Sequence, residues 1–389
     1  MKKLPTGKNK AQGYYETYNN QILPLLTDIE KSRLEQLKKF RMKSFLCFGL
    51  PAILFLCIGL ACLYCWIFYP SSNVAFYLGL ICSCWFPFIL IFSPLFYVAD
   101  RKKEIIKFST MLKKSILSDL LNAFGDISWK GHDVSAKNLG DVLLTDSELK
   151  RSGLFIPYNT RFTDDEYRGV YENVEFKISE TELLYISGSG KRRTIISAFK
   201  GVVISFKYNR KIKNRTIIST KGDLTQKNQA LIMATVFTTP FIELFKDGYA
   251  HWKVISMVIL FVIVYLITQK VQSKEEERLD EVRLEDPKFS KRFNVYSSDQ
   301  IEARYLVSPA FMERFYDLQT AFGAKKIKCS FVDETLMIAI ETNKNLFEIG
   351  SLFKSLNDPT SINNFYNELA SIYKMIDYFK LYENVYLSK

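Results

Sequence analysis

Residues 44–99 read SFLCFGLPAILFLCIGLACLYCWIFYPSSNVAFYLGLICSCWFPFILIFSPLFYVA, and these 56 residues contain no Asp, Glu, Lys, Arg or His. A helix needs about 20 residues to cross the ~30 Å hydrocarbon core of a membrane. The stretches 44–69 and 74–98 both reach this length, and the uncharged segment Pro70-Ser71-Ser72-Asn73 connects them. We therefore expect a transmembrane hairpin over residues 44–99, which excludes a purely soluble protein.

Basic residues flank both ends of this hairpin. The chain has a net charge of +12, and residues 1–43 hold ten Lys or Arg against four Asp or Glu. By the positive-inside rule, both flanks lie in the cytoplasm. The flanking side chains that we expect to contact lipid headgroups are Lys38, Lys39, Arg41, Lys43, Arg101, Lys102 and Lys103. This position beside a membrane explains the basic charge better than nucleic-acid binding does, so we expect no nucleic acid.

A second apolar segment spans residues 228–269. Sixteen uncharged residues from 254 to 269 reach about 24 Å as a helix, which is enough for a third span if flanking side chains reach the membrane surface. The part from 228 to 242 contains Pro240, and a buried soluble helix is its alternative. The segment thus holds none, one or two spans. We favour a second hairpin because it keeps both halves of the chain on one side of the membrane.

These boundaries predict the following organisation: a cytoplasmic N-terminal helical segment (1–43), a transmembrane hairpin (44–99), the first part of an α+β soluble domain (100–227), the second hydrophobic segment (228–269), and the second part of the α+β domain (270–389). The fold class is an integral membrane α-helical hairpin with a cytosolic α+β domain, in which helices pack on an antiparallel sheet. On the N-terminal helix, the expected apolar face holds Ile22, Leu25, Leu26, Ile29, Leu34 and Leu37.

Residue patterns place strands and helices within the soluble domain. Runs of β-branched and aromatic residues predict an antiparallel meander of strands at 174–186, 194–208 and 215–220, and a hairpin pairs 325–330 with 336–341. Asp299 with Glu302 and Ser308 with Pro309 are typical of helix starts. The last helix, from about residue 361, repeats apolar residues at 362, 365, 369, 372, 376 and 379. Packing on its own sheet is the expected role of this stripe, and self-association is the alternative.

No catalytic motif stands out. Only two histidines occur, His132 and His251, and the turn Gly188-Ser189-Gly190-Lys191 lacks the glycine and the hydroxyl residue that a Walker A motif requires. The carboxylates Asp164-Asp165-Glu166 lack a metal-ligand spacing, so we interpret them as residues that are solvated in a loop or that cap a helix. We therefore expect no catalytic residue, no bound metal and no cofactor.

Three segments near the C-terminus resemble a known family. They are VRLEDPKF (282–289), FNVYSSDQIEARYL (293–306) and SPAFMER (308–314). They are similar to a bacterial family of unknown function, the DUF 3137 type. The resemblance extends over the N-terminal Tyr-rich helix, the paired spans, Tyr167 to Tyr171, and Phe199-Lys200-Gly201. It implies a bacterial membrane-anchored protein without an assigned activity, and it carries over no catalytic or binding residue.

Together these features predict a multi-pass protein of the bacterial inner membrane with a cytoplasmic N-terminus. We expect a non-enzymatic protein whose cytosolic domain binds membrane lipids, a protein partner or a second copy of itself. The alternative is an enzyme that acts on a membrane-associated substrate through dispersed residues.

Overall fold

The computed structural model describes residues 19–20, 23–68, 97–115, 117, 121, 126–131, 142–187, 194–207, 212–223, 255–256, 258–266, 279–344, 346–358 and 360–386. The chain divides into two compact units. The first contains Phe124–Phe347 and Asn364–Lys389, and the second contains Leu4–Ala123 and Glu348–Asn363. Each unit is described by itself.

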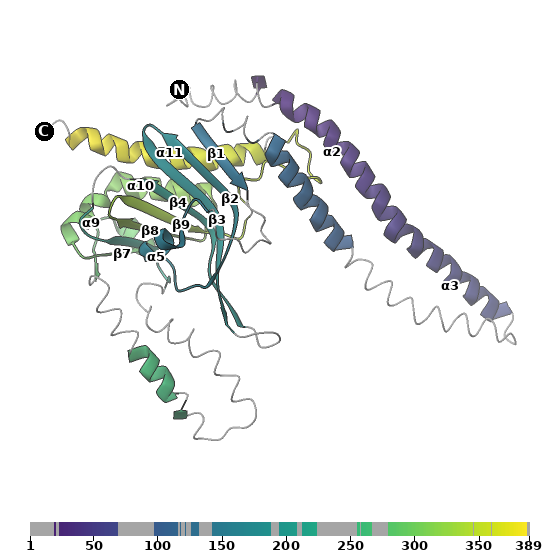
Figure 1. Ribbon diagram of the computed structural model, residues 1–389, viewed down its shortest axis with the longest axis horizontal. Coiled ribbons are helices and arrows are strands. Elements are labelled where there is room, and N and C mark those ends of the chain that lie inside the picture. The colour runs from purple at the N-terminus through teal and green to yellow at the C-terminus, as the bar shows by residue number, and fades with distance from the viewer. Residues whose placement is uncertain are drawn as a thin grey trace. The chain divides into compact units, whose positions relative to one another are not determined.

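An antiparallel sheet of nine strands forms the centre of the first unit (Figure 1). In chain order the strands are β1 (Asp126–Gly131), β2 (Thr160–Tyr171), β3 (Val174–Ser187), β4 (Thr194–Lys207), β5 (Thr216–Thr220), β6 (Asp280–Glu281), β7 (Phe293–Ser297), β8 (Lys326–Val332) and β9 (Thr335–Glu341). Their order across the sheet is β1-β2-β3-β4-β9-β8-β5-β7-β6. The antiparallel sheet with packed helices is confirmed.

The predicted meander is correct for two of its three strands. β3 and β4 pair from Phe176 with Phe206 to Ser187 with Thr194. β5 does not follow β4 in the sheet, because the β8–β9 hairpin lies between them and β5 pairs with β7 and β8. The prediction was wrong at this point because residue patterns locate strands but do not show which distant strand becomes the neighbour.

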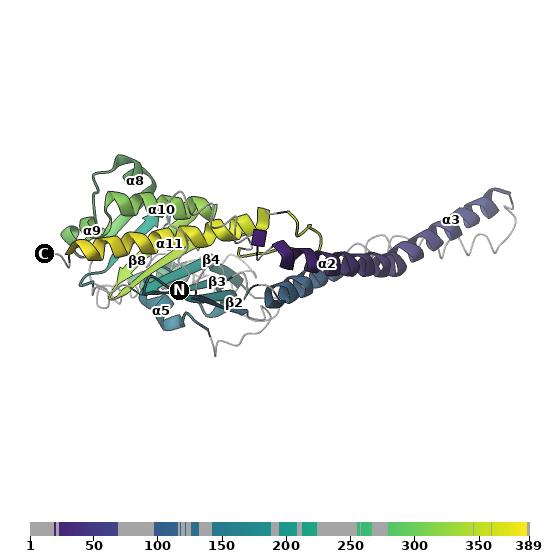
Figure 2. The same cartoon turned by 90° about the horizontal axis from the view of Figure 1, so that it is seen from above.

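Helices of the sheet unit include α5 (Asp146–Arg151), α8 (Pro287–Arg292), α9 (Gln300–Leu306), α10 (Pro309–Ala321) and α11 (Thr360–Tyr386). Figure 2 shows α10 and α11 on one face of the sheet and α5 on the other. The α5 face has its own apolar cluster, which includes Leu149, Phe155, Phe199 and Ile217. Both faces of the sheet therefore pack against other parts of the chain.

The predicted helix starts are confirmed. The Asp299 carboxylate accepts hydrogen bonds from the backbone N–H groups of Ile301 and Glu302, and Ser308 Oγ accepts one from Phe311 N. Asp286 caps α8 in the same way. The Glu302 carboxylate binds outside its own helix, where it accepts from the backbone N–H of Lys213 at 3.2 Å and of Asn214 at 2.9 Å. It thereby fixes α9 to the turn before β5.

The apolar stripe of α11 packs on the sheet of its own chain. Phe365 is buried and lies 6.5 Å from Tyr167 of β2 between ring centroids. Tyr373, about two turns further on, stacks on Tyr171 at 4.1 Å between ring centroids. Packing on its own sheet is therefore confirmed for the described part of the stripe, while the side chain of Phe379 lies outside the described residues.

Gly201 explains one segment of the family resemblance. It lies in β4 opposite Glu341 of β9, with a φ of 150° that L side chains rarely adopt. A Cβ at this position would collide with the Ile340 carbonyl oxygen of β9. Only glycine allows the two backbones to approach this closely, so Phe199-Lys200-Gly201 has a structural role.

One continuous helical segment begins the second unit. α2 (Leu23–Ser44), a π-helical segment (Phe45–Gly49) and α3 (Leu50–Phe68) join without a break, because Ser44 and Leu50 keep right-handed helical angles. The helix over Leu23–Ala61 is long and apolar enough to cross a membrane, and none of its most apolar window is buried. Residues 69–96, which contain the predicted second span, lie outside the described residues. Only the first half of the hairpin is therefore seen as a helix.

A buried carboxylate in α11 makes the stability of the sheet unit depend on pH. Glu368 is 6% exposed and accepts a hydrogen bond from the backbone N–H of Phe347 at 3.2 Å. Burial raises the pKa of Glu368 to about 7, against the smaller opposing effects of this hydrogen bond and of the Lys344 charge. Between the usual carboxyl pKa and about 7, the folded chain binds a proton that the unfolded chain releases, so stability falls as pH rises through this window.

We predict that Glu368→Gln removes this pH dependence, because the amide is neutral and still accepts from Phe347 N. The difference in free energy of unfolding between variant and parent should grow in favour of the variant from pH 4.5 to pH 8, by up to about 3 kcal/mol. Chemical denaturation at both pH values measures it. A constant difference across this range would contradict a raised pKa at Glu368.

Candidate functional site

Glu30 and Arg33 form a buried ion pair within α2, about three to four turns before the uncharged run. Arg33 donates from Nε to Glu30 Oε2 at 2.8 Å and from Nη2 to Glu30 Oε1 at 2.7 Å. Their side chains are only 6% and 10% exposed. The Arg33 hydrogen bond is the main reason that the pKa of Glu30 is lowered, and it outweighs the effect of burial. The Glu30 carboxyl is therefore charged at neutral pH.

Residues 348–358, here called the strap, satisfy the rest of this pair. Arg33 Nη1 donates to the Leu352 carbonyl oxygen at 2.7 Å. Glu30 accepts from Ser355 Oγ at 3.1 Å and from Leu356 N at 2.9 Å. The strap thus binds α2 across more than 300 residues of sequence through three hydrogen bonds to charged groups, which are stronger than neutral ones.

The strap also binds the helix that follows the predicted hairpin, residues 97–115. Glu348 accepts from Ser109 Oγ and from Lys113 Nζ, each at 2.8 Å. The side chain of Lys113 is 6% exposed, so this ion pair is largely shielded from water on the lysine side. One segment of chain therefore holds both helices that border the uncharged run.

Aromatic contacts extend this arrangement toward the uncharged run. Phe40 of α2 lies 5.4 Å from Phe353 of the strap and 6.0 Å from Tyr97 of the returning helix, measured between ring centroids. The Arg101 guanidinium lies 4.6 Å from the Phe353 ring centroid, which is cation–π geometry. Phe40 is 5% exposed. Side chains from the strap and from the returning helix thus pack against Phe40.

Lys43 and Asp100 mark where the chain leaves this unit and returns. Lys43 Nζ lies 3.0 Å from both carboxylate oxygens of Asp100. This contact raises the pKa of Lys43, mainly through the hydrogen bonds that Lys43 donates to Asp100. No charged residue lies between Lys43 and Asp100. The uncharged run therefore begins directly after Lys43 and ends directly before Asp100.

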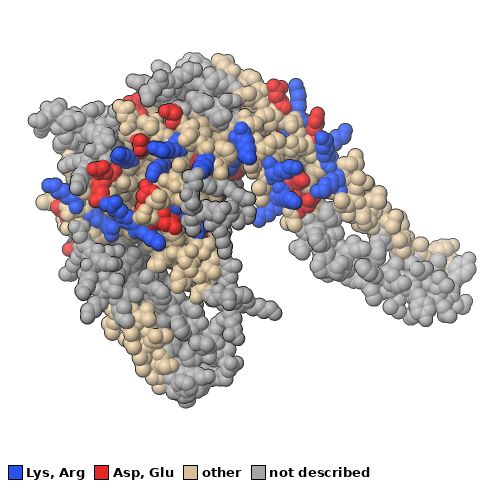
Figure 3. Space-filling model, viewed as in Figure 1, with Lys and Arg blue, Asp and Glu red and all other residues tan. Residues whose placement is uncertain are grey.

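The structure brings the seven predicted lipid-contact residues to one region of the second unit, and all seven are exposed. Lys38, Lys39, Arg41 and Lys43 lie on the last two turns of α2, and the other three lie at the start of the helix over 97–115. Figure 3 shows basic side chains gathered beside the uncharged surface of α3. Lys43 and Arg101 bind Asp100 and the Phe353 ring, so these two are partly engaged within the chain.

The sequence analysis did not find the strap or the buried pair. Its expected apolar face of α2 included Leu25 and Leu34, which are 38% and 51% exposed. The buried positions are Leu26, Glu30, Arg33, Leu37 and Phe40. Their spacing of four, three, four and three residues is a helical stripe, but two of its members are charged, and a search for apolar periodicity passes over them.

Three carboxylates of the sheet unit form an acidic cluster. The ligand oxygens of Asp164, Asp165 and Glu180 lie within 4.8 Å of one another, so among the described residues these could hold a cation. Trp129 Nε1 donates to Asp165 Oδ1 at 2.8 Å. The interpretation of residues 164–166 as solvated in a loop or capping a helix was wrong, because they lie in β2 and Asp165 is buried. A register shift in the β2–β3 pairing at this point turns the carboxylates inward.

Arg161 pairs with Glu166, a buried carboxylate next to this cluster. Its guanidinium donates to the Leu144 carbonyl oxygen and to Ser179 Oγ, and it lies 3.7 Å from Glu166. Glu166 in turn accepts from Leu143 N at 2.9 Å. These bonds attach the segment before α5 to the sheet, so this buried cluster has a clear structural role.

Comparison with protein families gave one match. Residues 197–381 match the family described as Protein of unknown function (DUF3137), which confirms the resemblance of the segments between 282 and 314. The paired spans and Tyr167 to Tyr171 lie outside the matched residues, so their resemblance stays a prediction. Comparisons with curated proteins and with solved structures gave no match.

We predict that Arg33→Met destabilises the second unit by about 3 to 5 kcal/mol, because it leaves the Glu30 carboxylate buried without its counterion. Glu30→Gln with Arg33→Met should cost less than Arg33→Met alone. The matched control is Lys31→Met on the same helix, since Lys31 and its partner Asp28 are both 82% exposed.

Amide hydrogen exchange at Leu356 measures this effect in the detergent-solubilised chain. Exchange should accelerate in Arg33→Met and stay unchanged in Lys31→Met. Because the pKa of Glu30 is lowered, the parent should also lose this protection as pH falls below the usual carboxyl range. Equal exchange in the two variants would show that the strap does not depend on the ion pair.

Proposed function

We propose that this relative of the DUF3137 family is a non-enzymatic integral protein of the bacterial inner membrane. A transmembrane hairpin over 44–99 anchors it, and its N-terminus and folded parts lie in the cytoplasm. The basic residues beside the hairpin contact anionic lipid, and the sheet unit binds a protein partner or a second copy of the chain.

The contact between Lys43 and Asp100 carries this proposal. The two residues are 57 positions apart and their side chains bond at 3.0 Å. A segment that leaves and returns to the same point crosses a membrane an even number of times. With 44–69 and 74–98 each long enough to span, two crossings follow, and both flanks lie on the side that the positive-inside rule assigns to the cytoplasm.

The exposure of α3 supports insertion into lipid. Leu54, Leu60 and Phe68 are 59%, 60% and 63% exposed, and the 19 residues of α3 carry no charge. At 1.5 Å per residue, α3 is about 28 Å long, close to the thickness of the hydrocarbon core. In water this helix would expose an apolar surface of a size that soluble proteins avoid.

The strap supports an even number of crossings in the second hydrophobic segment as well. It binds α2 and the helix over 97–115, so it lies on their side of any membrane. The chain between residues 115 and 348 therefore crosses twice or not at all. Residues 258–266 are helical, and Val258, Ile263 and Leu266 are about half exposed. This apolar exposure favours two crossings, which form a second hairpin within 228–269.

No specific observation among the described residues favours the alternative enzyme. The buried polar groups around Arg161 are bonded to one another and to the backbone, which is typical of a structural network. The family match supplies no activity either. A binding role at the membrane surface is therefore the function that the geometry supports best.

Single-cysteine variants test this topology, in a chain whose native cysteines are replaced. An impermeant maleimide applied to intact spheroplasts should label Ser72→Cys, in the predicted outer connection. It should not label Lys150→Cys or Lys354→Cys, which are exposed positions in α5 and the strap. All three should label equally after lysis. Labelling of Lys150→Cys in intact spheroplasts would overturn the proposed orientation, and opposite results for Lys150→Cys and Lys354→Cys would overturn the even number of crossings.

A further inference from the structure

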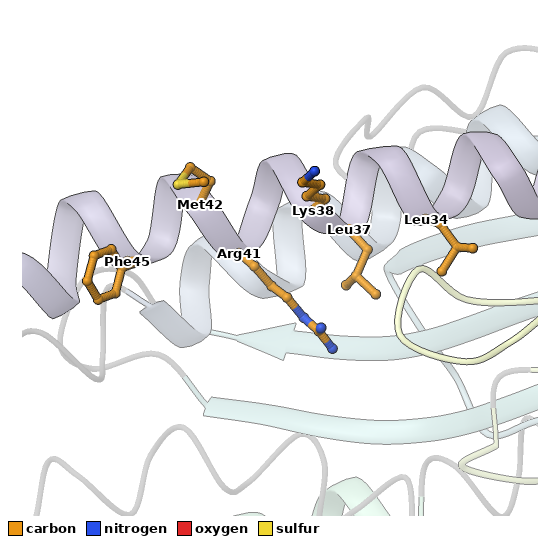
Figure 4. A pocket seen from close by; sticks show the side chains of 6 residues that line it. All are labelled: Leu34, Leu37, Lys38, Arg41, Met42 and Phe45. Atoms are coloured by element: carbon orange, nitrogen blue, oxygen red, sulfur yellow. The ribbon is translucent and has the colours of Figure 1, made fainter.

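α2 also carries a groove beside its buried stripe, and the two share Leu37. The groove has a volume of about 350 Å³ and is lined by Leu34, Leu37, Lys38, Arg41, Met42 and Phe45. Figure 4 shows these side chains along three turns of the helix, with apolar and basic side chains interleaved. Leu34, Met42 and Phe45 are 51%, 56% and 49% exposed. Apolar side chains exposed to this degree beside two cations are typical of a surface that binds a ligand with an anionic and an apolar part.

The two cations in this groove are exposed and available to bind an anion. Within the described residues, Lys38 and Arg41 make no ion pair with a carboxylate, whereas Lys43 is bound to Asp100 and Arg101 lies over the Phe353 ring. Arg41 is one turn from Phe45, and Lys38 is one turn from Met42, so each cation has an apolar neighbour toward α3. The positive charge in the groove therefore has no partner of its own among these residues.

The groove lies where the charged part of the helix becomes uncharged. Arg41 is three residues before Ser44, so it lies about 5 Å below the start of the run, within the headgroup layer of a bilayer. Phe45 is the second residue of the run and lies at the hydrocarbon boundary. An anion at Lys38 and Arg41 and an acyl chain at Met42 and Phe45 would match this change in polarity.

We propose that this groove binds one anionic phospholipid, with its phosphate between Lys38 and Arg41 and the first part of an acyl chain along Met42 and Phe45. This rests on the proposed insertion of the hairpin, and it goes beyond a general attraction of the basic flank to the membrane. A volume of about 350 Å³ is in the range of sites for single small ligands. A second copy of the chain would need a contact surface of about 800 Å² on each partner.

Native mass spectrometry of the full chain in detergent, titrated with phosphatidylglycerol or with phosphatidylcholine, tests this site. The parent chain should bind one phosphatidylglycerol saturably and with clear preference. Lys38→Gln with Arg41→Gln should weaken this binding about thirtyfold, because each cation contributes about a factor of five to anionic lipid binding. Lys102→Gln with Lys103→Gln, the matched control on the returning helix, should change it less than threefold.

Other results would overturn the proposed site, and each would give a different explanation for the observed lipid binding. Equal weakening in both double variants would show diffuse attraction by the whole basic flank. Displacement of the lipid by millimolar glycerol phosphate, together with no effect of Met42→Gln, would show a site for free anions. Loss of a dimer mass in Lys38→Gln with Arg41→Gln would assign the groove to a second copy. Release of the parent chain from membranes by alkaline carbonate would instead overturn the proposed membrane insertion itself.

Discussion

The buried pair of Glu30 and Arg33 is the interaction on which the arrangement of the second unit depends. A buried charge is tolerated only when its counterion and its remaining hydrogen bonds are all in place. Arg33 supplies the counterion for Glu30, and the strap supplies the Leu352 carbonyl, the Ser355 hydroxyl and the Leu356 N–H. The helix that precedes the uncharged run and a segment near the C-terminus therefore need each other. This requirement specifies the register of the strap more strictly than apolar contact alone would.

One helix serves two environments, and its side chains change accordingly along its length. On α2, one stripe is buried against the strap. This stripe contains apolar side chains and the charged pair of Glu30 and Arg33. From Phe45 onward no charge remains, and large apolar side chains are exposed. Lys43 and Asp100 lie at the change between these two regions, where a partly exposed ion pair costs little free energy.

The sequence predicted those parts of the fold that local patterns determine. Asp299, Ser308 and Pro309 mark helix starts because the first N–H groups of a helix need acceptors or a residue without a donor. The α11 stripe and the β8–β9 hairpin follow from periodicity and turn residues. The segments that resemble the family contain these caps and core residues, so they describe a fold and not a site. β2 was missed because its charged residues, Arg161 and Glu166 among them, are buried by partners elsewhere in the chain. The strap was missed for the same reason, since the Leu352 carbonyl that binds Arg33 lies 319 residues away in the sequence.

The strand order has a consequence for how the protein is made. β4 has β3 on one side and β9 on the other, and β5 is separated from β4 by the β8–β9 hairpin. When synthesis has reached residue 320, the strands of both halves of the sheet have been made. The hairpin of β8 and β9, which joins these halves, has not. The strand pair that joins the two halves of the sheet is thus among the last parts of the chain to be made, and the sheet can be completed only late in synthesis.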